Sequence, residues 1–261
     1  MKIGVFDSGL GGLVIAKSFM DKLPQYDYVY FGDNAHLPYG EKTPQEVLDY
    51  TLSALRFLIK QECRLIILAC NTASCIALRY IQQKYIPATT PDIKVLGVIV
   101  PTVEQALQAS ISNIAVVATP ATVKSNIYEI ELKKINPSVR VTSVATPELV
   151  PAIEQNDFVA AKAAIQKYVP TLSNCSALIL GCTHYPLIKP LFQGALPQIQ
   201  IISQDDFMGD KLADYLQRHP EIEQTLSKNQ QHSFFVTKDS DSSENVARLI
   251  FPTISLQTVQ L

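Results

Sequence analysis

The segments LIILACNTAS at residues 65–74 and ALILGCTHYP at residues 177–186 place a cysteine in the same local frame. Each cysteine, Cys70 or Cys182, follows a short apolar run and precedes small polar residues. An apolar run of this length that ends in polar turn residues is typical of a buried parallel strand. Each thiol is therefore expected at the carboxyl end of a strand, where open α/β sheets bind their ligands. The matched pair favours a functional role over packing as two small hydrophobic side chains.

The pattern around the cysteines repeats further upstream. The chain opens with a strand that ends near Asp7 and continues into a turn of small residues and a helix, and a second strand of this kind ends near Ala118. The offset between these two positions is 111 residues, and the offset between the two cysteines is 112. A nearly constant offset predicts a duplicated unit whose halves face each other, with one thiol on each side of a shared cleft.

Strand and helix patterns alternate along the chain, which favours βα units and parallel sheets. The predicted fold class is α/β, with two facing, doubly wound domains that have mainly parallel sheets, are related by a pseudo-twofold axis and enclose the active site in the cleft between them. Strands are expected at residues 2–6, 28–32, 65–69, 94–98, 114–117, 140–144, 177–180, 199–203 and 233–237. Helices are expected to begin near Gly12, Thr43 (in a capping box with Glu46), Thr72, Thr102, Thr122, Pro151, Pro186 and Phe207.

The domain boundaries are predicted where the chain crosses between the halves. No linker rich in Gly or Ser divides the sequence, so the halves are expected to share an interface. The first domain would comprise residues 1–96 and 207–261 and carry Asp7 and Cys70, whereas the second would comprise residues 97–206 and carry Thr119 and Cys182. Near the C-terminus we expect a turn or cap cluster at residues 239–245 and a short helix with Val246, Leu249 and Ile250 on one side.

The composition argues against several classes of protein. The 261 residues are 47% hydrophobic and 18% charged, as in an ordinary globular protein. A net charge of -2 without a Lys/Arg cluster argues against nucleic acid or a membrane surface as a partner. The opening strand leaves no room for a signal peptide, and no apolar run reaches transmembrane length. Five cysteines without a disulfide framework favour a reducing, cytoplasmic location.

No metal site is predicted. The sequence contains neither a CxxC nor an HExxH motif, and Cys70 and Cys75 are not followed by a second ligand pair at zinc-site spacing. The remaining cysteines, Cys63, Cys75 and Cys175, are interpreted as structural.

Loops at the expected strand ends supply polar groups for a ligand. The glycines of DSGLGG, residues 7–12, would let the backbone approach a ligand closely, although a simple tight turn explains them equally well. Asp7 could hold a substrate ammonium group or orient a thiol. The Pro38-Tyr39-Gly40 turn could bind a ligand but is also ordinary turn chemistry. Hydroxyls and an amide for a carboxylate are offered by Asn71, Thr72, Thr119 and Thr183.

An imidazole stands beside the second thiol. His184 follows Cys182 by two residues, where it could tune the thiol or aid proton transfer. A single histidine at a strand end is more often structural, and only the adjacent cysteine favours the functional interpretation.

In this order and spacing, DSGLGG, GDNAHLPYG, ACNTAS and GCTHYPL resemble the glutamate racemase family of cofactor-independent amino-acid racemases, from Lys2 to about Ile250. The resemblance implies two α/β domains across an active site. It also implies two cysteines that act as acid and base and interconvert L- and D-glutamate. Neither pyridoxal phosphate nor a metal would serve as a cofactor. Racemisation removes a proton from one face of the α-carbon and delivers one to the other, so two identical groups on opposite walls suit it. A modest depression of the ordinary cysteine pKa of about 8.5 would supply the thiolate.

The resemblance also assigns roles to individual residues. Cys70 would be the base toward the D-isomer, with assistance from Asp7, and Cys182 the base toward the L-isomer, with assistance from His184. Glu154 matches a glutamate thought to lie near that histidine. The implied substrate contacts are Asp7, Ser8, Tyr39, Gly40, Asn71, Thr72, Thr119, Thr122, Thr183 and His184. The implied partner is glutamate, used for peptidoglycan if the source is a bacterium with a cell wall, and the chain is compatible with a homodimer.

Two alternatives stay open. An aspartate racemase of the same family would differ in the length of the side-chain carboxylate that the pocket accepts, although ACNTAS and GCTHYP favour glutamate. A non-catalytic amino-acid-binding protein of the same fold would need neither thiol.

The chain departs from the family pattern at Thr146, where a cysteine is frequent, and at Val100, where many relatives carry an acidic residue.

Overall fold

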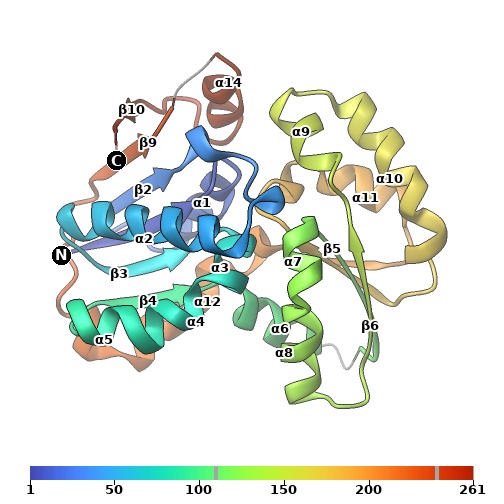
Figure 1. The fold of residues 1–261 in the computed structure, drawn as a ribbon, viewed down its shortest axis with the longest axis horizontal. Helices are drawn as coiled ribbons and strands as arrows, with labels where there is room; N and C mark the ends of the chain where they lie inside the picture. The colour runs from blue at the N-terminus through green and yellow to red at the C-terminus, as the bar shows by residue number, and fades with distance from the viewer. Residues whose placement is uncertain (109–110, 239–240, 261) are drawn as a thin grey trace.

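The first of two sheets carries both ends of the chain. The computed structural model describes residues 1–108, 111–238 and 241–260. The six-stranded sheet has the order β10-β9-β2-β1-β3-β4, and its paired strands are all parallel. Its strands are β1 (Lys2–Asp7), β2 (Tyr28–Gly32), β3 (Cys63–Leu68), β4 (Lys94–Gly97), β9 (His232–Val236) and β10 (Leu256–Thr258). This sheet forms the left-hand lobe in Figure 1.

The second sheet repeats the topology of the first. It has four parallel strands in the order β6-β5-β7-β8. Its strands are β5 (Asn113–Ala118), β6 (Arg140–Ala145), β7 (Ala177–Gly181) and β8 (Gln200–Ile202). This order corresponds to the β2-β1-β3-β4 part of the first sheet, strand for strand in sequence order. The two lobes of Figure 1 thus contain equivalent sheets, which confirms the predicted α/β class with two domains.

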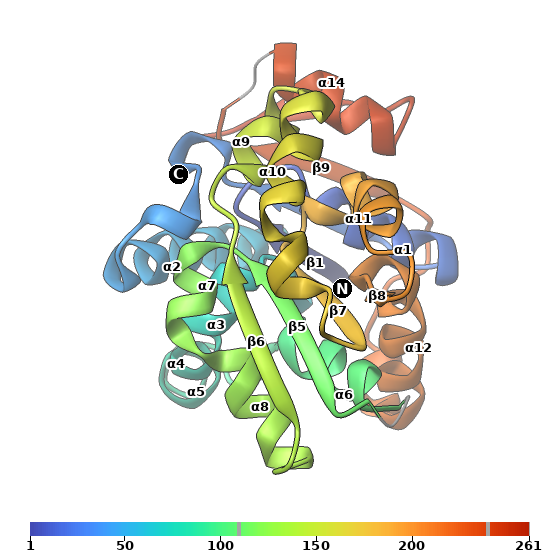
Figure 2. The same ribbon diagram turned by 90° about the vertical axis from the view of Figure 1, so that its right-hand side faces the viewer.

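Helices cover both faces of both sheets (Figures 1 and 2). In the part that belongs with the first sheet they are α1 (Gly12–Lys22), α2 (Pro44–Lys60), α3 (Asn71–Ile76), α4 (Leu78–Tyr80), α5 (Ile86–Thr89), α12 (Met208–Arg218), α13 (Pro220–Glu223) and α14 (Asp241–Ile250). Around the second sheet lie α6 (Ile99–Gln108), α7 (Pro120–Ser125), α8 (Ile127–Ile135), α9 (Leu149–Glu154), α10 (Phe158–Leu172) and α11 (Lys189–Ala195). Short single turns are η1 (Asn34–His36), η2 (Tyr39–Glu41), η4 (Tyr185–Ile188) and η5 (Gln204–Asp206), and η3 (Ile81–Tyr85) is a π-helical turn.

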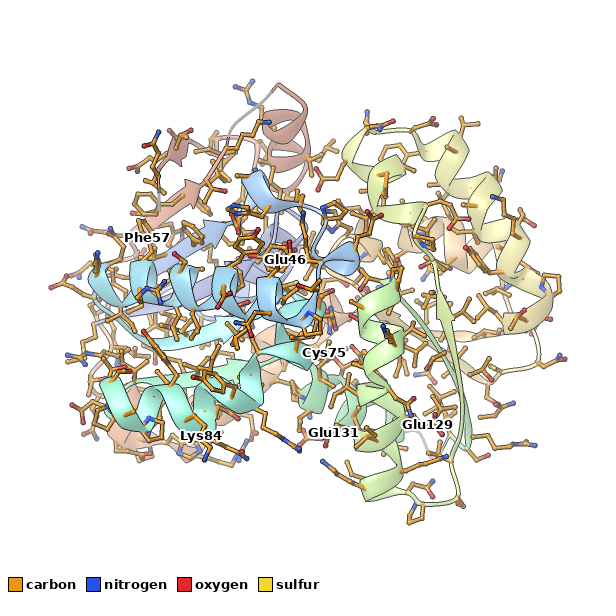
Figure 3. All side chains as sticks on the ribbon, viewed as in Figure 1. Glu46, Phe57, Cys75, Lys84, Glu129 and Glu131 are labelled. Atoms are coloured by element: carbon orange, nitrogen blue, oxygen red, sulfur yellow. The ribbon has the colours of Figure 1, made fainter. Side chains whose placement is uncertain are left out.

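Local sequence explains where these elements begin. The strands β1, β2 and β7 are almost entirely buried because helices lie on both faces, so they read as continuous apolar runs. At the start of α2 the Thr43 side chain accepts from the Glu46 N–H while the Glu46 carboxylate accepts from the Thr43 N–H, which confirms the predicted capping box. Glu46 is labelled at this end of α2 in Figure 3.

One apolar cluster joins the two domains on the side where the chain crosses between them. It combines residues of α1 and α12 from the first domain, such as Phe19 and Leu212, with Val103 of α6 and Val116 of β5. Because buried apolar surface resists exposure to water, this shared cluster stabilises the domains against separation on that side. The division into residues 1–96 plus 207–261 and residues 97–206 stays a prediction, and β4 of the first sheet extends one residue past the predicted boundary, to Gly97.

Several details differ from expectation. The helix expected near Pro151 is two helices, α9 and α10, because Asn156 adopts a left-handed conformation with φ of 57° between them. The short edge strand β10 was not predicted. Leu249 does not share the buried side of Val246 and Ile250 but is 62% exposed, since α14 buries only a narrow face. Of the predicted turn cluster, residues 241–245 are helical and residues 239–240 lie outside the described residues. None of the helices in the described ranges is long and apolar enough to cross a membrane.

Candidate active site

The two cysteines lie at equivalent positions of the two sheets. In each sheet the chain turns to opposite sides of one central strand, so a crevice opens between β1 and β3 and another between β5 and β7. Asp7 ends β1 and Cys70 follows β3, whereas Thr119 follows β5 and Cys182 follows β7. Thus both thiols are at carboxyl strand ends beside a topological switch point, as the sequence predicts.

These strand ends meet in one cavity between the domains. It is lined by Ser8, Leu37, Pro38, Tyr39, Gly40, Cys70, Asn71, Thr72, Thr119, Val150, Cys182, Thr183 and His184. Its volume is about 20 Å³, near the room that a single water molecule needs. The structure is therefore a closed arrangement in which both thiols face the same small space.

Three predicted site residues lie behind this lining and act on it through hydrogen bonds. The carboxylate of Asp7 accepts from the Thr183 hydroxyl at 3.1 Å. Thr122 accepts from the Thr119 hydroxyl at 3.0 Å. The Glu154 carboxylate makes a hydrogen bond with Nε2 of His184. All the other predicted site residues line the cavity itself.

The first thiol is buried among weak donors and acceptors. The Cys70 side chain is the N-cap of α3, where it accepts from the Ala73 N–H at 3.4 Å, and it donates to Oγ of Ser8 at 3.4 Å. Burial, together with the nearby charge of Asp7, raises the pKa of the Cys70 thiol to about 12. The modest depression of the pKa expected from the sequence is thus wrong for Cys70, because burial disfavours the thiolate.

The second thiol is paired with an imidazole. Sγ of Cys182 lies 3.8 Å from Nδ1 of His184, and Nε2 of that ring contacts the Glu154 carboxylate. Burial alone would lower the pKa of His184, but the hydrogen bonds and charges of Cys182 and Glu154 raise it well above its usual value. Burial would raise the pKa of Glu154, but His184 holds it below its usual value. The row Cys182–His184–Glu154 therefore favours an imidazolium next to the thiol.

Asp7 holds the glycine turn together rather than pointing into the cavity. One carboxylate oxygen accepts from the N–H groups of Gly9 and Gly12, both at 3.1 Å, and the other accepts from Thr183. Burial raises the pKa of Asp7, although these donors and the charge of His184 oppose the shift. The side chain thus ties the first domain's turn to the loop that follows Cys182 in the second domain.

Threonines and the turn at Tyr39 form another contact between the domains. Thr72 of α3 shares hydrogen bonds with Thr119 at 2.9 Å and Thr122 at 3.3 Å. A Cβ atom on Gly40 would lie 2.6 Å from Cβ of Thr119, so only glycine permits this approach. The Tyr39 hydroxyl donates to Asp33 at 2.7 Å, which anchors the turn in the first domain.

The structure adds residues that the sequence interpretation missed. Leu37 and Pro38 precede the predicted Tyr39, and Val150 on α9 supplies an apolar wall from the second domain. Gln204 lies behind Asn71 and exchanges two hydrogen bonds with it. Gln204 directly follows the predicted strand 199–203, so the strand-end rule used for the other sites would have found it.

The other cysteines lie elsewhere. Cys63 is fully buried at the start of β3, and Cys175 is buried just before β7. Cys75 lies on α3 and is labelled in Figure 3 on the side toward α7, where its thiol donates to the Thr72 carbonyl at 3.1 Å. Among the described residues no group of three His, Cys, Asp or Glu side chains is arranged to hold a metal ion. Two thiols, one from each domain, instead contribute to the lining of one cavity.

Known proteins are similar to this chain in both sequence and fold. Residues 14–204 match the family described as Asp/Glu/Hydantoin racemase. A glutamate racemase from Ruegeria pomeroyi is 41% identical over 238 residues, which cover 85% of this chain and 87% of that protein. The crystal structure of a Bacillus anthracis glutamate racemase superposes with a TM-score of 0.89 at 32% identity, covering 100% of this chain and 97% of that one. The Francisella tularensis glutamate racemase in complex with D-glutamate gives 0.87 at 35% identity, with 99% and 97% coverage.

The approach of Gly11 to His184 can be tested by adding one methyl group. A Cβ atom at Gly11 would lie 2.7 Å from Nδ1 and 2.8 Å from the backbone N of His184. We expect Gly11→Ala to lower the free energy of unfolding by about 1–3 kcal/mol, because the backbone at His184 must shift. The matched control is Gly194→Ala, whose added Cβ meets nothing within 4 Å. Urea denaturation of both variants measures the difference, and equal stabilities would contradict the close approach.

The His184–Glu154 pair should make stability depend on pH. A histidine whose pKa is higher in the folded protein stabilises the fold. This stabilisation is complete at pH values below the pKa of the unfolded protein, about 6.5, and is lost as the pH rises through the pKa of the folded protein. A glutamate whose pKa is lower in the folded protein stabilises the fold at pH values above the pKa of the unfolded protein, about 4.3. This stabilisation is lost as the pH falls through the pKa of the folded protein. Glu154→Gln should therefore destabilise most near pH 5–6.5 and progressively less toward pH 10.

Urea denaturation at pH 6 and at pH 9.5 measures this difference. The exposed Glu221→Gln serves as the control for removing a carboxylate, because Glu221 pairs with His219 on the surface. A Glu154→Gln effect of the same size at both pH values would rule out the charged pair.

Proposed function

The chain belongs to the Asp/Glu/hydantoin racemase family, and we propose that it interconverts L- and D-glutamate by proton transfer between Cys70 and Cys182. As a member of this family it is an isomerase. The observation that carries the mechanism is that the two thiols come from equivalent strand ends of two equivalent sheets and line one cavity.

The proposed reaction conserves one thiol and one thiolate. A thiolate on one wall takes the α-proton, which breaks the C–H bond and forms an S–H bond, while the electron pair spreads from the α-carbon into the substrate carboxylate. The thiol on the other wall then gives its proton to the opposite face of the α-carbon and becomes the thiolate. Cys70 is the base toward the D-isomer and Cys182 the base toward the L-isomer, as the family resemblance implies. No cofactor is required for this exchange.

Charge in the cavity decides when a thiolate forms. Burial and the charge of Asp7 raise the pKa of Cys70 to about 12, because both disfavour its negative charge. An α-ammonium group that enters beside the thiol opposes both effects, since a nearby positive charge favours the anion. The substrate itself thus prepares its base on the Cys70 side, whereas His184 lies beside Sγ of Cys182 on the other side.

Polar residues of the lining are proposed to bind the rest of the substrate. Hydroxyl and amide groups of Ser8, Asn71, Thr72, Thr119 and Thr183 are suited to the two carboxylates, and the Tyr39-Gly40 turn closes one side. A cavity of about 20 Å³ is smaller than any amino acid. Glutamate must therefore enter by separation of the domains at the hydrogen bonds that join Thr72 to Thr119 and Thr183 to Asp7.

We propose glutamate rather than aspartate as the substrate because the relatives reported above are named glutamate racemases. These relatives match this chain over most of their length. Supply of D-glutamate for peptidoglycan in the cytoplasm of a bacterium with a cell wall is the corresponding biological role. A homodimer is compatible with this proposal.

Purified protein should racemise glutamate without added cofactor. Circular dichroism of L-glutamate is expected to decay to zero in the presence of the protein, and the α-proton should exchange with deuterated water. Decay with aspartate but not with glutamate would assign the aspartate activity instead. Binding without exchange of the α-proton would identify a non-catalytic amino-acid-binding protein.

The two thiols should be separable by mutation. We expect Cys70→Ser and Cys182→Ser each to lower racemisation at least about 100-fold, because a positioned acid–base group contributes on the order of 10²–10⁴ and a serine hydroxyl ionises far less readily. Each variant keeps one thiol, so elimination from a β- or γ-substituted analogue should survive for opposite enantiomers in the two variants.

The control is Cys175→Ser, which changes a buried thiol outside the cavity. It should retain racemase activity and lose about 1 kcal/mol of stability. Wild-type racemisation by either Cys70→Ser or Cys182→Ser would refute the two-thiol mechanism.

A further inference from the structure

Two buried amides exchange hydrogen bonds behind the cavity. Nδ2 of Asn71 donates to Oε1 of Gln204, and Nε2 of Gln204 donates to Oδ1 of Asn71, both at 3.0 Å. Asn71 is the first residue of α3 and lines the cavity, whereas Gln204 lies in η5 and is not exposed at all. A buried amide that loses such partners is strongly disfavoured, so this pair restricts both side chains.

A threonine sets the direction of the Gln204 amide. The Thr102 hydroxyl donates to the Val98 carbonyl at 2.6 Å, so its single proton is used and its oxygen acts as an acceptor. Nε2 of Gln204 donates to that oxygen at 3.0 Å. The nitrogen of Gln204 must therefore face Thr102, and its Oε1 must face Asn71.

This direction passes to Asn71. Because Gln204 presents Oε1 as an acceptor and one N–H as a donor, Asn71 must offer Nδ2 to the first and Oδ1 to the second. The Tyr128 hydroxyl also donates to Oδ1 of Asn71, at 2.7 Å. Both lone-pair positions of Oδ1 are thus used, and one N–H of Asn71 remains for a group in the cavity.

The residues that set this orientation lie where the chain crosses between the domains. Thr102 is on α6, directly after the first crossing, and Gln204 lies between β8 of the second sheet and α12, which packs on the first domain. Asn71 belongs to the first domain and Tyr128 to the second. A change in the angle between the domains therefore reaches the Asn71 amide directly.

We propose that Gln204 is a positioning residue for racemisation, which holds the Asn71 amide so that its remaining N–H binds a carboxylate oxygen of the substrate. This inference rests on the proposed racemase function. The order of action is Thr102 on Gln204, Gln204 on Asn71, and Asn71 on the substrate.

A double-mutant cycle tests the order of action. Gln204→Leu keeps the approximate volume but removes both hydrogen bonds to Asn71. We expect it to raise KM about tenfold with kcat changed less than about threefold, because a uniform binding contact is lost. In an Asn71→Ala background the same change should alter KM less than about twofold, since residues that act through one another are not additive.

Two further variants keep the test decisive. Thr102→Val removes the acceptor that directs Gln204. It should raise KM about threefold in the wild-type background but not in the Asn71→Ala background. If Gln204→Leu does not fold, Thr102→Val takes its place in the cycle. Asp206→Asn changes an exposed residue of the same turn, which pairs with Lys189, and should leave KM unchanged. Equal losses in both backgrounds, or an unchanged KM for Gln204→Leu, would overturn the proposal.

The dissociation constant of D-glutamate, measured by calorimetry on the same proteins, gives a readout that does not depend on turnover. If the wild-type protein turns over neither glutamate nor aspartate, the proposed function fails. The same cycle in the dissociation constant then still decides whether Gln204 acts through Asn71.

Discussion

The structure depends on the placement of two chemically identical thiols, one from each domain, in the lining of one small space. A single domain presents its switch-point crevice to one side only, so it can bring one strand-end thiol to a ligand. Two copies of the β2-β1-β3-β4 arrangement, set face to face, bring Cys70 and Cys182 to the same cavity. The duplication therefore suits the proposed reaction, in which a proton is exchanged between two faces of one carbon.

The backbone duplication does not extend to the groups that support each thiol. Cys70 has a hydroxyl, a backbone N–H and a buried carboxylate nearby, and these do not offset the effect of burial on its pKa. Cys182 has His184, whose positive charge is supported by Glu154. This asymmetry agrees with the proposed reaction, in which one cysteine is a thiol while the other is a thiolate.

The sequence predicted those features that depend on short segments. A continuous apolar run followed by polar residues located Asp7, Cys70, Thr119 and Cys182, because the burial of a parallel strand and the exposure of its end are both local properties. Glu154 could not be found by this rule, since it lies at the end of a helix, and only the family resemblance indicated it. Its contact with His184 joins residues 30 positions apart and depends on how α9 packs.

The expected pKa of Cys70 was wrong for a related reason. Sequence indicates which groups neighbour a thiol along the chain, but the degree of burial follows from the second domain closing over it. The same holds for Thr146, which replaces a frequent family cysteine and pairs with the Tyr185 hydroxyl at 2.6 Å. Its environment is set by residues 39 positions away. Long-range packing thus fixes the electrostatic properties of residues whose positions were predicted locally.

Closure of the domains and chemistry in the cavity are linked by the same contacts. On one side of the molecule the domains are joined mainly by the apolar cluster that includes Phe19, Val103 and Val116, whose burial resists exposure to water. On the other side the joining contacts are hydrogen bonds, such as Thr72 with Thr119 and Thr183 with Asp7, which water or a substrate can replace at small net cost. The molecule is therefore expected to open at the polar side and pivot at the apolar side. Because the polar contacts are made by residues that line or support the cavity, the groups freed by opening are those that an amino-acid substrate would bind.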